Sequence, residues 1–224
     1  MQASDRARDA SGRDLRPPCA PALPDPPSAF GEDGLACMLR RHSVGPKYLV
    51  PPAPSPRQWR QAAAVALRAP DHGDLRPFRF VVVGDDQRER LAGLFAQDAA
   101  RRGHLAEEVE RARARAGNGP GLVALVARIR DGLEQTPVHE QWISVGAGLM
   151  NFLNALHLMD FGAKTLSGAS VRDADVVSAF CAEGETLVAW IVVGTPTHTS
   201  RAKRADDVDA AIGPWPPAAR SPLA

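Results

Sequence analysis

Aromatic residues and cysteines are both scarce in this chain of 224 residues. Phe, Trp and Tyr together make up 5% of the sequence, so we expect a core built mainly of Ala, Val and Leu. The three cysteines, Cys19, Cys37 and Cys181, are odd in number and far apart, and no Cys-x-x-Cys pair occurs. This spacing argues against a disulfide framework or a zinc site and favours a reducing compartment, the cytoplasm.

An excess of charge of one sign is also lacking. The chain carries 27 basic and 26 acidic residues, a formal net charge of +1, which gives no reason to expect a nucleic acid or an anionic membrane as a partner. Its first residues lack the apolar stretch of a secretory signal. The long apolar segment 143–159 is interrupted by Ser, Asn and His, so it predicts a buried helix and not a membrane span.

Several catalytic patterns are absent from the sequence. There is no Gly-x-Ser-x-Gly, no phosphate-binding Gly-x-x-x-x-Gly-Lys, no His-Glu-x-x-His and no Gly-x-Gly-x-x-Gly. None of the six histidines is spaced from another as a pair of metal ligands would be, which argues against a metal centre. Cys37 could act as a nucleophile, but a structural thiol is its more ordinary role.

Composition divides the chain into three parts. Residues 1–33 are rich in Pro, Asp, Arg and Ala and have no apolar periodicity, so we expect a disordered extension. Residues 34–200 have the patterning of one folded domain, and residues 201–224 form a polar, Pro-containing arm. These boundaries place any chemistry in the central part.

Helical and strand patterns alternate along residues 34–200. Periodic apolar residues predict helices at 34–41, 55–69, 85–102, 138–160 and 173–180, and a solvated helical face at 105–116. Runs of β-branched residues predict strands at 78–83, 122–129 and 186–193, with a short strand or loop at 163–166 and a Pro-rich loop at 44–54. Together these elements predict an α+β fold in which helices cover a central sheet.

Local signals refine three of the helices. Ser55 followed by Pro56 predicts a helix start, and Asp85-Asp86 is expected to cap the next helix. In the long helix, the small residues Gly146, Ala147 and Gly148 would let another helix approach closely.

The first cluster of candidate binding groups is Arg40-Arg41-His42-Ser43, just after a helix. Guanidinium groups donate in a planar fork and a hydroxyl donates once more, a set that suits a phosphate monoester. Taken alone, the cluster has a plainer interpretation, because an exposed arginine pair is usually only solvated.

Two further clusters lie in loops. Arg68-Ala69-Pro70-Asp71-His72 joins a helix to a strand, where His72 could donate to a ligand or Asp71 could merely orient it in a structural turn. Phe161–Gly168 follows the long helix, and its backbone N–H groups could face a ligand or form an ordinary turn.

The order of these segments resembles the nitroreductase family of flavoproteins over about residues 35–200, most closely its short bacterial subgroup of NAD(P)H nitroreductases. The most specific part is Ala-Pro-Asp-His at 69–72 with Pro77 and Phe80 after it. The resemblance implies an intertwined homodimer with a central mixed or antiparallel sheet, and a tightly bound FMN at each subunit interface. By the same resemblance the cofactor-binding residues are Arg41, His42 and Ser43 at the FMN phosphate, Arg68 and His72 reaching the flavin of the other subunit, and Thr165, Leu166 and Ser167 under the isoalloxazine edge.

The activity that the resemblance implies is a ping-pong oxidoreductase. NADH or NADPH gives a hydride to FMN and leaves, and a nitroaromatic, quinone or similar small acceptor then collects the electrons. No side-chain acid or base is required, so no catalytic residue is assigned. The alternatives are other flavin chemistry on the same scaffold (dehalogenation, enoate reduction or flavin cleavage) and a flavin-binding or interaction protein without turnover.

The chain departs from the subgroup at three places, one of them the mild change of the usual Trp after Pro77 to Phe78. Thr165-Leu166-Ser167 stands where Trp-Arg-Ser is usual, so a cation is lost that Lys164 or backbone donors would have to replace. The loop after Ser43 is about two residues longer than the common pattern, which leaves the role of Lys47 as a flavin-edge cation open. A further phosphate contact could come from Arg201, Lys203 and Arg204.

Overall fold

The computed structural model describes residues 28–198, 208 and 210–215. The chain divides into two units, residues 1–39 and 40–224. In the first unit the described part is the helix α1 (Ser28–Arg40), which begins at Ser28 and not at the Gly34 expected from the sequence. Most of the expected extension 1–33 and of the expected arm 201–224 lies outside the described residues, so both remain predictions.

The second unit alternates helices and strands in the expected order. Its helices are α2 (Pro56–Ala66), α3 (Arg88–Arg101), α4 (Ala106–Ala114), α5 (Val138–Leu158) and α6 (Ala174–Phe180). Its strands are β1 (Leu49–Val50), β2 (Phe78–Val82), β3 (Gly121–Arg128), β4 (Gly162–Leu166) and β5 (Glu185–Pro196). Short 3-10 helices are η1 (Pro46–Tyr48), η2 (Asp85–Gln87), η3 (Arg115–Gly117) and η4 (Ala169–Arg172). Strand β1 lies in the segment that the sequence predicted to be only a loop.

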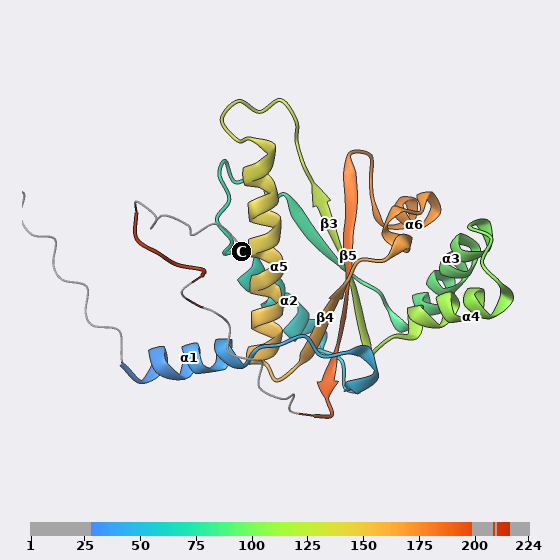
Figure 1. Ribbon diagram of the computed structural model, residues 1–224, viewed down its shortest axis with the longest axis horizontal. Helices are drawn as coiled ribbons and strands as arrows, with labels where there is room; N and C mark the ends of the chain where they lie inside the picture. The colour runs from blue at the N-terminus through green and yellow to red at the C-terminus, as the bar shows by residue number, and fades with distance from the viewer. Residues whose placement is uncertain (1–27, 199–207, 209, 216–224) are drawn as a thin grey trace, which may run out of the picture. The chain divides into compact units, whose positions relative to one another are not determined.

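The strands form one sheet in the order β1-β5-β3-β2, and β4 also pairs with β5. Each strand pair is antiparallel. The register of β3 on β5 shifts between Leu125 and Val126, where β5 accommodates an extra residue as a bulge. Figure 1 shows α5 standing along one side of this sheet and α3, α4 and α6 on the other. The predicted α+β architecture, a central sheet covered by helices, is confirmed.

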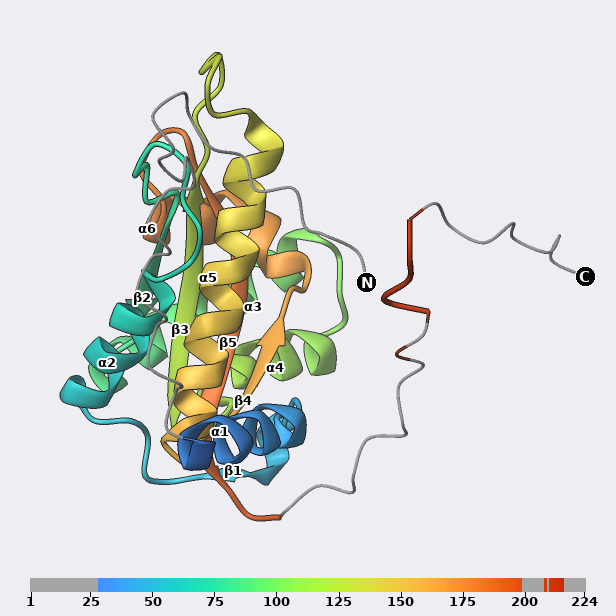
Figure 2. The same ribbon diagram turned by 90° about the vertical axis from the view of Figure 1, so that its left-hand side faces the viewer.

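The sheet separates two apolar cores. On one face, Leu125 of β3 packs in a cluster with Phe152 of α5 and with residues of α2. On the other face, Trp190 of β5 packs with Phe95 of α3 and with residues of α6. Because helices cover both faces, every residue of β3 except Arg128 is buried. Figure 2 shows α5 and α2 lying in front of the strands, so the unit has three layers.

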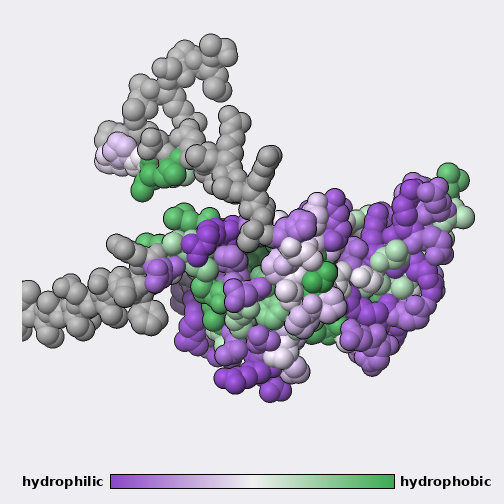
Figure 3. Space-filling view, turned by 90° about the horizontal axis from the view of Figure 1, so that it is seen from below, coloured by the Kyte–Doolittle hydropathy of each residue, from purple (hydrophilic) through white to green (hydrophobic). Residues whose placement is uncertain are grey.

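The α3–α4 end of this unit is hydrophilic, as Figure 3 shows on its right-hand side. Arg111 pairs with Glu107 one turn away at 3.0 Å, and Arg113 pairs with Glu89 of α3. The solvated helical face predicted for 105–116 is therefore present, divided between α4 and η3. None of the described helices combines the length and the apolarity needed to cross a bilayer.

Of the local predictions, the one for Ser55 holds, the one for Asp85-Asp86 is wrong, and the one for the small residues of α5 is wrong at Gly148. Ser55 caps α2 through a capping box with Gln58, as predicted. Asp85 and Asp86 do not cap α3, because they lie inside the 3-10 turn η2 that precedes it. A Cβ on Gly148 would lie 2.3 Å from the Phe78 ring, so this glycine admits a side chain of β2 and not another helix.

A buried carboxylate joins β5 to its neighbours. The Glu185 side chain is 1% exposed and accepts from Arg79 on β2, from Arg128 on β3 and from the Ala182 amide. The hydrogen bond from Arg79, with help from the other two donors, outweighs burial and lowers the pKa of Glu185 to about 2. This cluster links β2, β3 and β5 at the end of the sheet where β5 begins.

Candidate functional site

The Arg41–Ser43 segment lies along the outer edge of β4. Ser43 forms a parallel bridge with Ala163, and the Val44 amide donates to the Ala163 carbonyl at 3.0 Å. Since β5 pairs with the other edge of β4, this short pairing attaches the segment to the sheet. Arg41, His42 and Ser43 are thereby held beside the beginning of β4.

The imidazole of His42 is oriented by the local backbone. Its Nδ1 lies 3.0 Å from the carbonyl oxygen of Arg40, which only accepts, so Nδ1 carries a proton and donates. The other nitrogen, Nε2, is buried and has no hydrogen-bond partner among the described residues. A buried polar atom without a partner costs free energy, so Nε2 is a place where a ligand would be stabilised.

A cavity of about 190 Å³ lies where β4 begins and α5 ends. Its charged and titratable lining is Arg41, His42, His157, Asp160 and His198. One guanidinium and three imidazoles face a single carboxylate, a balance that suits an anion. The sequence spacing of the histidines excludes only metal pairs, so it gives no signal for His157 and His198. His157 and His198 come together because the last residues of α5 and β5 lie at the same end of the sheet. No local sequence motif indicates this proximity.

The segment Thr165-Leu166-Ser167 closes the other end of β4. Thr165 pairs with Ile191 and faces the α2–α5 layer, whereas Leu166 pairs with Trp190 and faces the α3–α6 layer. The Thr165 hydroxyl is buried, and it too lacks a hydrogen-bond partner within the described part of the chain. Polar atoms in need of a partner therefore lie toward both ends of β4.

The sequence offers three further candidate cation sites: Lys164 as a substitute for the missing arginine, Lys47 at the flavin edge, and Arg201, Lys203 and Arg204 as a phosphate contact. Lys164 shares a face of β4 with Leu166, so it can act only on the α3–α6 side. Lys47 lies in η1, with its Nζ 4.8 Å from the centre of the Tyr48 ring. Arg201, Lys203 and Arg204 lie outside the described residues.

The Arg68–His72 loop is anchored to the beginning of α5. The Ser144 hydroxyl donates to the Pro70 carbonyl at 2.6 Å, and His72 Nδ1 lies 2.8 Å from Glu140 Oε2. Asp71 does not orient His72, because its carboxylate accepts from the Arg76 amide at 2.7 Å. The partner Glu140 was missed by the sequence analysis, since it lies 68 residues away in the chain.

The Arg68 side chain is exposed at the rim of a separate cavity of about 380 Å³, which Asp71 and Arg76 also line. It makes no hydrogen bond or ion pair with any residue that the structure describes. Its guanidinium group therefore remains available to a ligand or to a second chain.

One subunit does not bring all the candidate residues together. His72 contacts Glu140 in the first turn of α5, whereas His42 shares a cavity with His157 in its last turn. Seventeen residues of helix separate these two positions, a rise of roughly 25 Å. Figure 1 shows the two segments at opposite ends of α5.

Comparison with known proteins identifies the family of this chain. The family model described as the nitroreductase family matches residues 38–195. An Escherichia coli K12 protein named "Putative NAD(P)H nitroreductase YdjA" is 30% identical over 165 residues, which cover 73% of this chain and 88% of that protein. A Haemophilus influenzae protein of the same description is 29% identical over 164 residues, again 73% of this chain and 88% of the relative.

Solved structures share the fold at low sequence identity. A nitroreductase-like protein from Bacillus cereus has a TM-score of 0.65 at 14% identity, covering 82% of this chain and 96% of that one. A Desulfovibrio desulfuricans nitroreductase described in complex with FMN has a TM-score of 0.59 at 19% identity, covering 82% and 98%. The family match extends over more than half of the chain and over both ends of β4. The chain therefore belongs to the nitroreductase family and is a flavin-dependent oxidoreductase.

Proposed function

We propose that this chain takes two electrons from NADH or NADPH and passes them through FMN to a nitroaromatic, a quinone or a similar small acceptor. Family membership, the names of the curated relatives and the FMN complex among the similar structures support both cofactors. The order we propose is ping-pong, so the nicotinamide leaves before the acceptor binds. The cytoplasm, expected from the odd number and wide spacing of the cysteines, is the compartment in this proposal.

The observation that carries the proposal is the unsatisfied Nε2 of His42 beside Arg41, in the segment that pairs with the beginning of β4. A guanidinium, an imidazole and a hydroxyl in sequence are the donor set that a phosphate monoester needs. A second unsatisfied polar atom, the hydroxyl of Thr165, lies toward the other end of β4. The residues present therefore fit a ligand with a phosphate at one end and a polar ring at the other.

FMN, when bound, supplies the hydride-transfer chemistry between donor and acceptor. The residues of the chain bind and orient: in the proposal Arg41 and Ser43 donate to the phosphate, and backbone amides near Ser167 donate to the flavin edge. Because Nδ1 of His42 already donates to a carbonyl, Nε2 accepts from a hydroxyl when the ring is neutral and donates to a phosphate oxygen when it is protonated. For a nitro acceptor, R–NO₂, NAD(P)H and one proton give R–NO, NAD(P)⁺ and water.

A homodimer is part of the proposal, because one chain separates His72 and Arg68 from Arg41 and His42 by the length of α5. The exposed face of α5 suits a second copy of this chain. It presents large apolar side chains, among them Ile143, which is 62% exposed, and Leu158. Gly146 lies on the same face with open space around it, so a second helix could approach closely.

The direct test is to purify the full chain and to measure bound flavin and its response to NADH and NADPH under anaerobic conditions. We expect FMN to copurify, its absorbance near the visible maximum to bleach with one nicotinamide, and colour to return when a nitroaromatic or a quinone is added. Protein that contains FMN but does not bleach would be a passive flavin binder. Protein that takes up no flavin would overturn the proposal.

A further inference from the structure

A second cavity, of about 360 Å³, lies on the α3–α6 face of the sheet. This volume is within the range of small-molecule sites, roughly 300–1,000 Å³. Its lining is mostly apolar, with Phe95, Trp190 and Leu122 among the apolar residues, and its polar groups include Arg115 and Asn118. The loop that begins with Ser167, proposed above for the flavin edge, closes one side.

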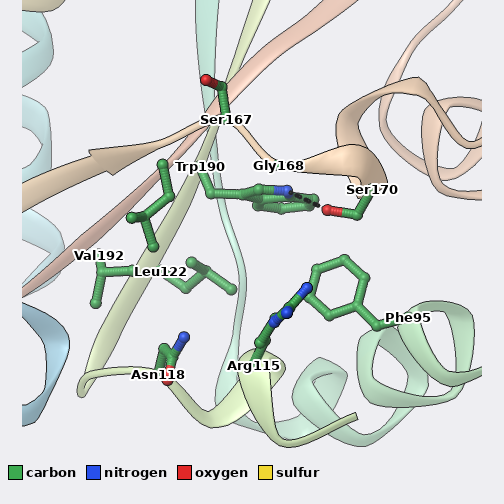
Figure 4. A pocket seen from close by; sticks show the side chains of 10 residues that line it. Phe95, Arg115, Asn118, Leu122, Ser167, Gly168, Ser170, Trp190 and Val192 are labelled. Atoms are coloured by element: carbon green, nitrogen blue, oxygen red, sulfur yellow. Dashed lines mark hydrogen bonds between the residues drawn. The ribbon is translucent and has the colours of Figure 1, made fainter. Parts of the chain in front are cut away.

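The aromatic wall is held rigidly. The Trp190 Nε1–H donates to the Ser170 hydroxyl at 3.2 Å, as Figure 4 shows. The Phe95 and Phe180 rings meet Trp190 edge to face, with centroids 5.4 and 5.0 Å away. An indole with its N–H bonded and two rings packed against it presents a fixed surface to whatever enters the cavity.

Two further segments around the cavity are fixed by arginines that bind the backbone. Arg88 of α3 donates to the carbonyls of Ala116 and Pro120, at 2.6 and 3.1 Å, and so holds the segment between η3 and β3. Arg102 donates to the Ala169 carbonyl at 3.2 Å and so holds the loop after β4. The aromatic wall and these two segments are therefore in place before a ligand binds, which lowers the entropy cost of binding.

Arg115 is the cation of this cavity. Figure 4 shows its guanidinium group beside the Phe95 ring and pointing into the cavity. Its side chain has no hydrogen bond or ion pair with any described residue. The carboxylates on the neighbouring surface are already engaged, Asp98 with Arg102 and Glu108 with His104. Arg115 is therefore free to pair with a ligand.

We propose that this cavity is the acceptor pocket and that it selects planar aromatic acceptors carrying a carboxylate or another anionic substituent, which Arg115 binds. The inference rests on the proposed function, because the loop beginning at Ser167 would place such an acceptor beside the flavin. Flat apolar walls favour an aromatic ring, and a guanidinium fork favours a carboxylate over a neutral group. Asn118 provides a second polar contact on the same side of the cavity.

The test compares 4-nitrobenzoate with its neutral analogue 4-nitrobenzamide as acceptors for the full-length holoenzyme. Arg115→Gln should raise the KM for 4-nitrobenzoate roughly tenfold and leave kcat and the KM for 4-nitrobenzamide within about twofold. Asn118→Asp, which adds a negative charge to the wall, should also weaken only the anionic acceptor. Arg111→Gln is the matched control, because it removes a neighbouring cation that does not line the cavity.

Direct binding separates this inference from the reductase proposal. Benzoate should quench tryptophan fluorescence through Trp190, and Arg115→Gln should raise its dissociation constant roughly tenfold without changing FMN content. That result would uphold the anion site even if every reductase assay failed. Equal losses for both acceptors, the same effect from Arg111→Gln, or loss of FMN from Arg115→Gln would overturn the inference, the last because the cavity would then hold the flavin.

Discussion

His72 and Glu140 form a hydrogen bond, 2.8 Å from Nδ1 to Oε2, that joins the loop before β2 to the first turn of α5. The pair leaves Nε2 of His72 as the atom that can meet a ligand. This His72 nitrogen lies at the opposite end of α5 from His42. The structure therefore has a candidate polar site at each end of α5, the helix whose exposed face we assign to the dimer interface.

The role of His72 can be tested by replacing it with alanine. His72→Ala should raise the FMN dissociation constant about tenfold while the protein stays folded, because one hydrogen bond to the ligand is lost. Excess FMN should then restore turnover. His104→Ala is the matched control, since His104 also pairs with a glutamate, Glu108, on the remote helix α4.

Two outcomes would contradict this account of His72. If saturating FMN restored the flavin spectrum but not turnover, His72 would take part in the reaction. If the His72→Ala variant failed to fold, its pairing with Glu140 would be structural. Glu140→Gln, which keeps an oxygen acceptor for Nδ1, should weaken FMN binding less than His72→Ala does.

Arg41 should discriminate between flavins with and without a phosphate. Arg41→Ala should weaken FMN binding roughly 10- to 100-fold and riboflavin binding little, because a charge-assisted hydrogen bond contributes roughly 1.5–3 kcal/mol. Isothermal titration of apoprotein with both ligands measures this difference. Arg40→Ala, which removes an adjacent guanidinium that does not line the cavity, should change neither affinity much. Equal losses of FMN and riboflavin would mean that Arg41 acts on the fold.

Glu185 should make stability depend on pH. Its pKa is lowered to about 2 in the folded state, so its contribution is fully present above the unfolded pKa of about 4.3 and is lost as pH falls toward 2. At pH 7 this contribution is roughly 3 kcal/mol. The difference in unfolding free energy between wild type and Glu185→Gln should therefore shrink between pH 5 and pH 3, as measured in urea. The exposed Glu183→Gln should show no such trend.

Two helix glycines should respond in opposite ways to alanine. A Cβ at Gly148 would lie 2.3 Å from the Phe78 ring, so Gly148→Ala should destabilise the fold by about 1–3 kcal/mol through overpacking. Gly93 in α3 has nothing within 4 Å, so Gly93→Ala should stabilise it by about 0.5–1 kcal/mol. Urea unfolding measures both. A neutral Gly148→Ala would mean that Phe78 moves aside without cost.

The sequence predicted most of the elements because their signals are local. The Ser55-Pro56 start of α2 and the β-branched run of β3 depend only on neighbouring residues. The features that local signals missed depend on partners distant in the chain: the ring of Phe78 against Gly148, and the Glu140 carboxylate that binds His72. The same reason explains why Arg115 was not singled out. Its importance comes from facing Trp190 across a cavity, and nothing in its local sequence shows this.

The central claim is that one flavin site is built from two chains, and mixed dimers test it most directly. Differently tagged Arg41→Ala and His72→Ala chains are combined, and the heterodimers are purified, stripped of flavin and titrated with FMN. If Arg41 and His72 serve one FMN from opposite chains, each mixed dimer has one doubly damaged site and one intact site, so we predict one tight site per dimer. Two equally weakened sites would place both residues on the same side of the pocket, and a monomeric protein would contradict the account outright.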